Sequence, residues 1–299
     1  MKIMVFGAGS LGSVIGALLS RFHEVCLITR GEHLKEIRKN GLRLEGLLDE
    51  TFKLQSYDAP RKDSSFDLVI VTVKSYDTEI AARTIEQSFS GRPLVLTIQN
   101  GIGNAEKIAS VLGKQNVALG VTSMAAHRSR PGVVKYVCQD EMILGSLSRL
   151  SEAVIRSEEA LSVANISARR TENIEGVIWS KAIVNAAINP LTAIHRCKNG
   201  VIAQDNALRE QALKICEEGA QVASAKRISL DPHDVARYMM SVATKTAMNK
   251  SSMLMDVEFG RRTEIEAICG EILRAGKEVG VETPTISKLY SEIKAIEPK

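Results

Sequence analysis

Short apolar runs alternate with segments of helical spacing along the first half of the chain. The strand candidates are residues 3–6, 24–28, 67–73 and 93–98, with further β-rich segments at 42–44, 51–54, 117–123, 133–137 and 142–144. Helical spacing marks residues 11–20 and 32–39 between them. The run at 67–73 is continuous and β-branched, which is typical of a buried parallel strand. Strands and helices that alternate at this spacing predict a parallel sheet with helices on both faces.

The pattern changes after about residue 170, where strand-like runs stop. Helices are expected over residues 175–193, 204–225, 233–246 and 263–279. Asp231 and Pro232 favour a helix start, and Gly280 favours a stop. The predicted fold class is therefore α/β, with an N-terminal Rossmann-type doubly wound sheet in residues 1–170 and a C-terminal all-α domain in residues 171–299. We expect the first domain to bind a dinucleotide, and the second to bind substrate and to form a homodimer.

Composition excludes several function classes. The 299 residues carry 39 Lys and Arg against 35 Asp and Glu, a mild net charge of +4, and no basic run with interleaved aromatics appears. We therefore expect no nucleic-acid partner. Regular glycines in the first twenty residues argue against a signal peptide, and no later apolar run reaches about 18 residues, so no membrane span is expected. The five cysteines are odd in number and form no CxxC pair, which favours a cytoplasmic protein without disulfides or a metal site.

A glycine-rich turn follows the first strand candidate. Residues 7–12, GAGSLG, match the GxGxxG pattern between a strand and a helix. Gly7 permits the tight turn, Gly9 lets the backbone approach a pyrophosphate, and Gly12 allows close packing of helix on strand. Free N–H groups at the helix start would then face the phosphates. We expect the cofactor to contact the turn residues Gly7, Ala8, Gly9, Ser10, Leu11 and Gly12. The alternative is a glycine-rich turn without a ligand.

The end of the second strand bears on the choice of dinucleotide. An NAD site usually places Asp or Glu there to hold the ribose 2′-hydroxyl. This strand instead ends in Thr29 and Arg30, and the next carboxylate is Glu32. A guanidinium pairs well with a 2′-phosphate and stacks on adenine. We therefore expect NADP(H) as the cofactor, while a solvated surface arginine is the alternative interpretation of Arg30.

Two more polar residues follow later strands of the predicted sheet. Lys74 comes directly after the run at 67–73, and Asn100 follows the run at 93–98. Ligands of such sheets gather at the carboxyl ends of the strands. We expect Lys74 to approach the cofactor or an acidic substrate, and Asn100 to hydrogen-bond the ribose or the nicotinamide region. For either residue alone, an ordinary surface role explains the pattern equally well.

An apolar segment at the start of the second domain carries a row of polar residues. In residues 179–190, WSKAIVNAAINP, Lys181, Asn185 and Asn189 stand four residues apart, which places them on nearly one face of a helix. A lysine can donate a proton or hold a developing oxyanion, and an asparagine offers a donor and an acceptor without charge. We expect this row to face a small polar substrate across a cleft from the cofactor, with a helix kink at Pro190. A buried polar seam is the alternative.

Two downstream segments add polar groups. Residues 249–254, NKSSML, read as a polar loop or helix start whose hydroxyl and N–H groups suit a carboxylate. Residues 263–265, TEI, open a helix with an acidic residue in the first turn, a position that the helix dipole favours. A simple helix-start charge is therefore the alternative interpretation of Glu264.

Taken together, these segments resemble the ketopantoate reductase family, the 2-dehydropantoate 2-reductases. The likeness rests on GAGSLG at 7–12, TVK at 72–74, QNGIGN at 99–104, WSKAIVNAAINPLTAI at 179–194, NKSSMLMD at 249–256 and TEIEAICG at 263–270. The segments match in order and spacing over nearly the whole chain. The resemblance implies that NADPH delivers a hydride to the C2 ketone of 2-dehydropantoate, giving (R)-pantoate for pantothenate and coenzyme A biosynthesis.

The resemblance also assigns roles to individual residues. It implies that Lys181 is the general acid and that Glu264, the second residue that we take as catalytic, holds a substrate hydroxyl. Arg30 matches the basic residue for the NADP phosphate. Residues near cofactor and substrate would be Lys74 and Asn100, and substrate would be bound by Asn185, Asn189, Asn249 and Ser252.

Three other functions stay open from the sequence. One is an NADPH-dependent reductase of another branched 2-oxo acid, because the motifs specify hydride chemistry better than the acyl side chain. Another is a non-catalytic NADP-binding sensor on the same fold, although such a sensor would need neither Lys181 nor Glu264. The last is a β-hydroxyacid dehydrogenase similar to 6-phosphogluconate dehydrogenase, which would oxidise a 3-hydroxy acid.

Overall fold

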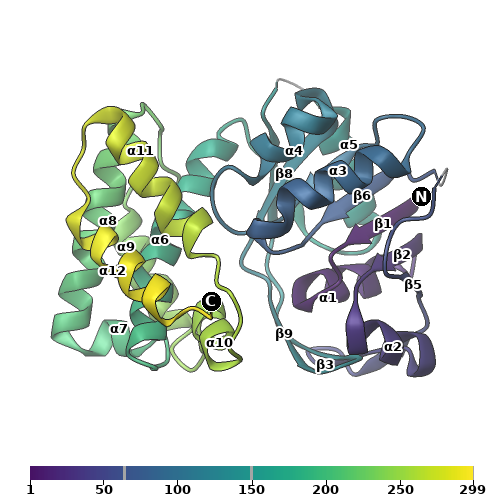
Figure 1. Ribbon diagram of the computed structural model, residues 1–299, viewed down its shortest axis with the longest axis horizontal. Helices are drawn as coiled ribbons and strands as arrows, with labels where there is room; N and C mark the ends of the chain where they lie inside the picture. The colour runs from purple at the N-terminus through teal and green to yellow at the C-terminus, as the bar shows by residue number, and fades with distance from the viewer. Residues whose placement is uncertain (63–64, 149–150, 299) are drawn as a thin grey trace. The chain divides into compact units, whose positions relative to one another are not determined.

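The computed structural model describes residues 1–62, 65–148 and 151–298, and it divides into two compact units (Figure 1). The first unit comprises Met1–Gln99 and Asn104–Ile174. The second comprises Asn100–Gly103 and Glu175–Lys299. The chain thus passes from one unit to the other at Ile174 and Glu175, and the short segment Asn100–Gly103 packs with the second unit. Each unit has its own aliphatic core.

An eight-stranded sheet forms the centre of the first unit. In spatial order its strands are β12 (Ala168–Arg170), β11 (Met142–Ser146), β8 (Val117–Thr122), β7 (Val95–Thr97), β6 (Leu68–Val71), β1 (Lys2–Phe6), β2 (Glu24–Ile28) and β5 (Gln55–Tyr57). The chain leaves β1 toward β2 on one side and returns to β6 on the other. The strand order therefore reverses between β1 and β6, which is where open α/β sheets bind ligands.

The predicted Rossmann-type α/β fold is confirmed, with two differences in the sheets. β11 runs antiparallel to β8, whereas the other neighbouring strands of the large sheet are parallel. The connection from β8 to β11 is a hairpin rather than a helical crossover, so the direction of the chain reverses. That hairpin completes a second sheet, which the sequence did not predict as a unit. Its strands are β4 (Glu50–Phe52), β3 (Leu42–Gly46), β10 (Val133–Cys138) and β9 (Ala125–Arg130).

Helices pack around these sheets. They are α1 (Ser10–Leu19), α2 (Gly31–Asn40), α3 (Thr78–Ser88), α4 (Asn104–Leu112) and α5 (Glu152–Val163), with short 3₁₀ turns η1 (Ser75–Asp77) and η2 (Lys114–Asn116). Helix α1 contacts β1 and β2 as well as the three strands β3, β9 and β10 of the small sheet, so it lies between the two sheets. Gly16 makes this close approach possible, because a Cβ there would lie 2.5 Å from the Leu27 side chain.

Over its described residues, the second unit consists of helices and loops and contains no strand. Its elements are α6 (Ile174–Ile194), α7 (Val201–Gln204), α8 (Asn206–Ala225), α9 (Val235–Lys245), α10 (Ser252–Glu258), a π-helical turn η3 (Glu266–Gly270), α11 (Glu271–Val279) and α12 (Pro284–Ile296). Two predicted helices differ in detail. Helix α9 begins at Val235 rather than near Asp231, because the Asp234 carboxylate caps it by accepting the Arg237 N–H at 2.9 Å. The helix expected over 263–279 contains the π turn.

Helix α6 is the central element of the second unit. It continues through Pro190 to Ile194, and Trp179, Ile183 and Leu191 are buried on it. Among the described residues, α6 is the one helix long and apolar enough to cross a membrane, but 78% of its most apolar stretch is buried within the structure. Its apolar composition is accordingly that of a core helix.

Candidate active site

The glycine-rich turn lies at the carboxyl end of β1, where the strand order reverses. Gly7 adopts φ +104°, a conformation that favours glycine. The Gly7 and Ala8 N–H groups both donate to the Ile28 carbonyl, at 3.0 and 2.8 Å, so the turn is fixed to the end of β2. Helix α1 then begins at Ser10, and Gly9 at its N-cap has no side chain to occupy the first N–H groups. The turn has the local geometry that binds a pyrophosphate at a helix start.

The three glycines of the motif differ in whether packing within the protein leaves room for a side chain. A Cβ on Gly12 would lie 2.3 Å from Thr72 Oγ1, and a Cβ on Gly7 would lie 2.6 Å from the Val73 amide nitrogen. A Cβ on Gly9 would meet only the Gly7 carbonyl oxygen, at an ordinary 3.8 Å. Close contacts therefore account for Gly7 and Gly12, whereas the structure leaves open space at Gly9. The approach of a pyrophosphate to Gly9 stays a prediction.

Alanine substitutions separate these roles. Gly9→Ala is expected to leave the melting temperature within a few degrees of wild type and to weaken dinucleotide binding by roughly tenfold or more, because its methyl group occupies the space of the pyrophosphate. Gly12→Ala is expected to lower the melting temperature instead, because the contact with Thr72 forces α1 from β1. Thermal unfolding and nucleotide titration measure both effects. If Gly9→Ala binds the dinucleotide as tightly as wild type, the glycine-rich turn is not part of the cofactor site.

Arg30 lies at the carboxyl end of β2, directly before α2. Its side chain is 77% exposed, and it donates a hydrogen bond to Asp77 Oδ2 at 3.1 Å. Asp77 belongs to η1, which follows β6, so the ends of β2 and β6 approach each other across the end of β1. Water weakens so exposed an ion pair, and the guanidinium remains accessible to a phosphate. Sequence reasoning missed Asp77, although it stands only three residues after Lys74.

Lys74 caps the same 3₁₀ turn. It is the residue before η1, its side chain is partly exposed, and its carbonyl accepts the Asp77 N–H at 2.8 Å. The structure therefore brings Lys74, Asp77 and Arg30 together with the glycine turn at the carboxyl ends of the strands of the large sheet. The sequence predicts a dinucleotide at these strand ends.

Gln99 is a structural residue that the sequence analysis did not assign. It ends the first stretch of unit one, and its side-chain amide donates to the Val73 carbonyl at 2.9 Å and to Thr78 Oγ1 at 2.8 Å. Its amide oxygen accepts a hydrogen bond from the Thr97 hydroxyl at 2.9 Å. The Thr78 hydroxyl also contacts Asn104 Oδ1 at 2.9 Å. These bonds hold the two ends of the segment that carries Asn100 against the carboxyl end of β6.

The segment Asn100–Gly103 itself packs with the helical unit. The Ile102 N–H donates to the Ala267 carbonyl at 2.8 Å. Gly101 has φ +92°, and a Cβ there would lie 2.6 Å from the same carbonyl oxygen. Asn100 is thereby placed in the unit that carries the other predicted substrate-binding residues.

The polar row on α6 keeps its predicted spacing, because the helix is continuous from Ile174 to Ile194. Lys181 and Asn185 are partly buried, and Asn189 is only 7% exposed. The residues between them, such as Ile183 and Ala186, are fully buried in the core. The row therefore forms the polar edge of a core helix and becomes more deeply buried toward its C-terminal end.

Two hydroxyl groups join the end of α6 to the start of α10. The Thr192 hydroxyl lies 2.7 Å from Ser251 Oγ and also contacts the Asn189 carbonyl at 3.0 Å. Ser251 caps α10 by accepting the Leu254 N–H at 3.1 Å. Neither Thr192 nor Ser251 was assigned from the sequence, although the paired serines in NKSSML could have indicated a cap.

This connection positions two predicted substrate-binding residues. Ser252 is the first residue of α10 and is partly buried. Asn249 precedes the cap, and its backbone carbonyl accepts the Asn199 N–H at 3.0 Å. The structure therefore brings the backbone positions of Asn189, Asn249 and Ser252 together at the junction of α6 and α10.

Glu264 is buried to 6% exposure just before the π turn. Its neighbour Thr263 is anchored by Glu297, whose carboxylate accepts the Thr263 N–H at 2.8 Å and hydroxyl at 2.5 Å. Burial opposes ionisation of Glu297, but hydrogen bonds from Lys294 and Thr263 outweigh it and lower the pKa of the carboxyl. A carboxylate that only complements a helix start is usually solvated, so the burial of Glu264 differs from what a simple helix-start charge would show.

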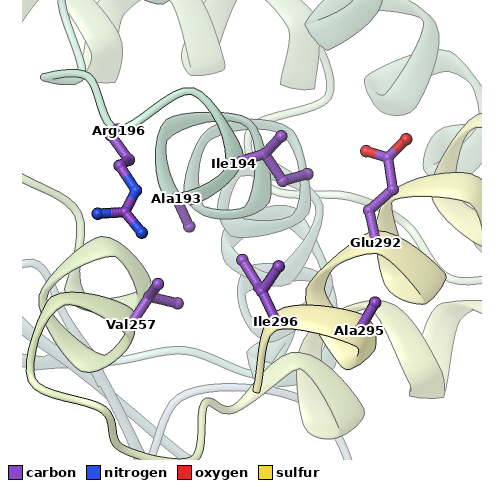
Figure 2. Close-up of a pocket in the computed structure, with 7 residues that line it drawn as sticks. All are labelled: Ala193, Ile194, Arg196, Val257, Glu292, Ala295 and Ile296. Carbon is purple, nitrogen blue, oxygen red and sulfur yellow. The ribbon is translucent and has the colours of Figure 1, made fainter. Parts of the chain in front are cut away.

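A pocket of about 440 Å³ opens elsewhere in the helical unit (Figure 2). It is lined by Ala193, Ile194, Arg196, Val257, Glu292, Ala295 and Ile296. None of the predicted site residues belongs to this lining, so the pocket does not identify the active site. Over the described ranges, no group of three or more His, Cys, Asp or Glu side chains is arranged to hold a metal ion.

Comparison with known proteins identifies the family. The model described as "Ketopantoate reductase PanE/ApbA" matches residues 3–149, and "Ketopantoate reductase PanE/ApbA C terminal" matches residues 173–297. This chain belongs to the ketopantoate reductase family. The resemblance inferred from the sequence is thus confirmed, and the family consists of nicotinamide-dependent reductases.

Members of the ketopantoate reductase family match over nearly their full length. A 2-dehydropantoate 2-reductase of Archaeoglobus fulgidus is 37% identical, covering 99% of this chain and 98% of the relative. One of Pyrococcus horikoshii is 36% identical with the same coverage.

Solved structures show the same fold. A PanE/ApbA family ketopantoate reductase from Ralstonia eutropha has a TM-score of 0.92 at 31% identity, over 99% of this chain and 98% of that one. A ternary structure of D-mandelate dehydrogenase with NADH and anilino(oxo)acetate has a TM-score of 0.93 at 30% identity, with the same coverage. The same fold is therefore found in a ketopantoate reductase and in a D-mandelate dehydrogenase.

Proposed function

We propose that the protein reduces 2-dehydropantoate to (R)-pantoate with NADPH, a step in pantothenate and coenzyme A biosynthesis. The observation that carries the proposal is the full-length similarity, at 37% and 36% identity, to two enzymes named 2-dehydropantoate 2-reductase. Lys181 and the buried Glu264 support a catalytic role rather than a sensor. A sensor would bind the dinucleotide without needing a proton donor or a buried carboxylate.

The residues of the first unit fit a dinucleotide. The space left open at Gly9 suits a pyrophosphate, and the exposed Arg30 guanidinium suits a 2′-phosphate. When bound, the reduced nicotinamide supplies the hydride. The protein contributes the turn that orients the phosphates and the cation that favours NADP(H) over NAD(H).

The residues of the second unit suit a substrate with a carboxylate, a ketone and a hydroxyl. Lys181 holds a proton at Nζ for the ketone oxygen, where negative charge develops as C2 is reduced. The amides of Asn185, Asn189 and Asn249 and the Ser252 hydroxyl supply neutral donors and acceptors for the carboxylate. Glu264 accepts a hydrogen bond from the substrate hydroxyl. Asn100 joins this set from the segment that packs with the helical unit.

Cofactor preference tests the assignment of Arg30. Arg30→Asp is expected to weaken NADPH at least about tenfold more than NADH, because the new carboxylate repels only the 2′-phosphate. Asp77→Asn is the matched opposite change. It releases Arg30 from its exposed ion pair and is expected to tighten NADPH by roughly twofold to fivefold, with NADH unchanged. Titration with both nucleotides measures these ratios. If Arg30→Asp weakens the binding of NADPH and NADH equally, Arg30 does not contact the 2′-phosphate.

A second candidate function is the reduction of another branched or aryl 2-oxo acid. It is favoured by the likeness to D-mandelate dehydrogenase, whose solved complex contains NADH and anilino(oxo)acetate. Nucleotide absorbance should be followed with NADPH and NADH over a panel of 2-dehydropantoate, 3,3-dimethyl-2-oxobutanoate and phenylglyoxylate. The proposal expects 2-dehydropantoate with NADPH to give the highest kcat/KM. A higher value for phenylglyoxylate would favour the second candidate, and tight NADPH binding without turnover would favour the sensor.

We further propose a cytoplasmic homodimer. The five cysteines are free, and burial raises the pKa of Cys26 to about 11 and of Cys216 to about 12, so these thiols stay protonated as core residues.

On the helical unit, Phe259 is 61% exposed and Ile296 is 47% exposed, which offers apolar surface to a second copy. Light scattering after size exclusion distinguishes a dimer from a monomer.

A further inference from the structure

The π-helical turn after Glu264 changes the hydrogen bonding of the chain. The Glu271 N–H donates to the Glu266 carbonyl, five residues earlier, instead of to the Ala267 carbonyl, four residues earlier. Ala267 therefore lacks the backbone partner that an α-helix would give its carbonyl. Such single π turns occur frequently at functional sites.

The Ala267 carbonyl accepts its hydrogen bond from the segment that carries Asn100. The Ile102 N–H donates to it at 2.8 Å, and Gly101 packs against the same residue with no room for a Cβ. Both Gly101 and Gly103 have positive φ, so the segment adopts a conformation that few other residues allow. The π turn therefore creates the acceptor that fixes this segment two residues after Asn100.

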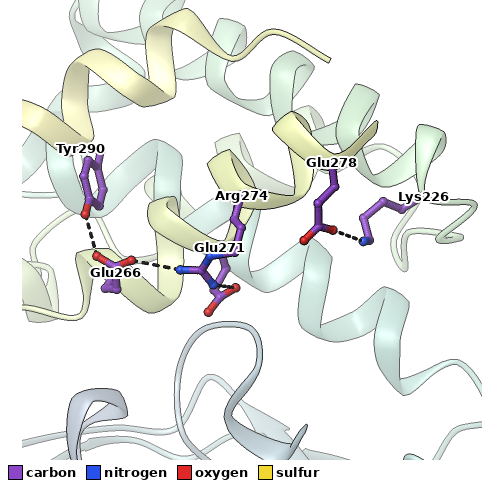
Figure 3. A network of polar contacts seen from close by, with 6 residues as sticks. All are labelled: Lys226, Glu266, Glu271, Arg274, Glu278 and Tyr290. Atoms are coloured by element: carbon purple, nitrogen blue, oxygen red, sulfur yellow. Dashed lines mark hydrogen bonds and ion pairs between the residues drawn. The ribbon is translucent and has the colours of Figure 1, made fainter. Parts of the chain in front are cut away.

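The turn is held by a polar cluster centred on Glu266 (Figure 3). The Tyr290 hydroxyl of α12 donates to Glu266 Oε2 at 2.6 Å, and Arg274 of α11 donates to Glu266 Oε1 at 3.2 Å. The Tyr290 bond is strong enough to raise the pKa of that phenol to about 12. Gly270 makes the arrangement possible, because a Cβ there would lie 2.9 Å from the Glu266 carboxylate.

Arg274 extends the cluster to the edge of the segment. It also pairs with Glu271, as Figure 3 shows, and the Glu271 carboxylate lies 3.4 Å from the place of a Cβ on Gly103. The two carboxylates at the ends of the π turn thus share one guanidinium. Glu278 of α11 forms a separate ion pair with Lys226, the residue that ends α8, at 3.1 Å.

We propose that Glu266 is a positioning residue, which with Tyr290 and Arg274 holds the π turn in the register that presents the Ala267 carbonyl to the Ile102 amide. It thereby fixes the segment Asn100–Gly103. Its consequence for catalysis rests on the proposed function, in which Asn100 contacts substrate and cofactor. Glu266 acts through the backbone of the segment and does not itself touch the reacting atoms.

Hydrogen exchange of the full-length protein tests the structural part directly. In Glu266→Ala, exchange of the Ile102 amide, followed by mass spectrometry on peptides spanning 99–104, is expected to become roughly tenfold faster, as one charged hydrogen-bond cluster is lost. Tyr290→Phe, which removes one hydroxyl group, is expected to change exchange in the same direction. Glu278→Gln is the matched control: it breaks the ion pair between α11 and the end of α8 and removes no hydrogen bond of the Glu266 cluster, so the Ile102 amide should exchange as in wild type. Unchanged exchange in both Glu266→Ala and Tyr290→Phe would overturn the proposal.

Kinetics test the catalytic part. Glu266→Ala is expected to lower kcat/KM for 2-dehydropantoate roughly tenfold through both kcat and KM, because a small displacement of Asn100 misaligns the substrate. Glu266→Gln keeps an acceptor for Tyr290 and should stay within about threefold of wild type. Faster exchange with unchanged kinetics would overturn the catalytic role. A wild-type enzyme inactive on every 2-oxo acid would instead refute the proposed function, and the exchange result would still decide whether Glu266 holds the segment.

Discussion

Lys181→Ala is expected to lower kcat for 2-dehydropantoate roughly a hundredfold or more, which is the usual contribution of a general acid. Reduction of the ketone places a full negative charge on one oxygen, and Lys181→Ala removes the cation that we propose supplies the proton. Binding of NADPH should stay close to wild type, because the glycine turn and Arg30 belong to the other unit. Stopped-flow absorbance of NADPH measures the chemical step, and nucleotide titration measures the binding.

A matched lysine separates this effect from a change in charge. Lys198 follows the same helix and is exposed, so Lys198→Ala removes one positive charge from the unit without altering the polar row. We expect it to keep wild-type turnover. Lys181→Arg keeps the charge but raises the pKa of the donor, and it should recover only part of the activity. Unchanged turnover in Lys181→Ala would exclude this residue as the proton donor.

Glu264→Gln is expected to lower kcat/KM for one substrate much more than for a close analogue. If the buried carboxylate accepts a hydrogen bond from the substrate hydroxyl, its loss should lower kcat/KM for 2-dehydropantoate by roughly tenfold to a hundredfold. The analogue 3,3-dimethyl-2-oxobutanoate has the same carbon skeleton and ketone but lacks that hydroxyl. Its kcat/KM should change by less than about threefold. The ratio of the two effects isolates the interaction with the hydroxyl, since any general damage to the site affects both substrates.

Two outcomes would contradict this assignment. An equal loss on both substrates, with an unchanged melting temperature, would show that Glu264 supports the site as a whole and does not read the hydroxyl. No loss on either substrate would show that Glu264 does not take part in substrate binding. Thermal unfolding is needed beside the kinetics, because Glu264 lies in the core next to the anchored Thr263.

The glycine turn and the polar row could be predicted because their requirements are local. A strand, a GxGxxG turn and a helix occupy consecutive residues, and a spacing of four residues defines one face of any helix that forms. The continuous α6 preserves that face through Pro190, so Lys181, Asn185 and Asn189 keep their relation. For the same reason six of the eight strands of the large sheet could be predicted from apolar runs. The short strands β5 (QSY) and β12 (ARR) have no such run and were missed, and the order of the strands could not be predicted.

Partners from distant parts of the chain could not be predicted in this way. Asp77 meets Arg30 only because β6 and β2 flank β1 in the sheet. Thr72 excludes a side chain at Gly12 only because β6 lies beside β1. The motif GAGSLG by itself gives no indication of this contact. The small sheet was missed because β3 and β10 are separated by almost ninety residues before they pair.

The sequence alone was enough to predict the family, the glycine-rich turn, the cation at the end of the second strand and the face of α6 that carries Lys181. Each of these is written in consecutive residues or in one helical period. Only the tertiary structure shows that the helix expected over 263–279 contains a π turn. It also shows that the Ala267 carbonyl accepts the Ile102 N–H, and that Glu266 holds the π turn through its bond with Tyr290. The residues of that turn have ordinary helical composition, and only the packing of a segment some 160 residues earlier shows why one hydrogen bond was shifted.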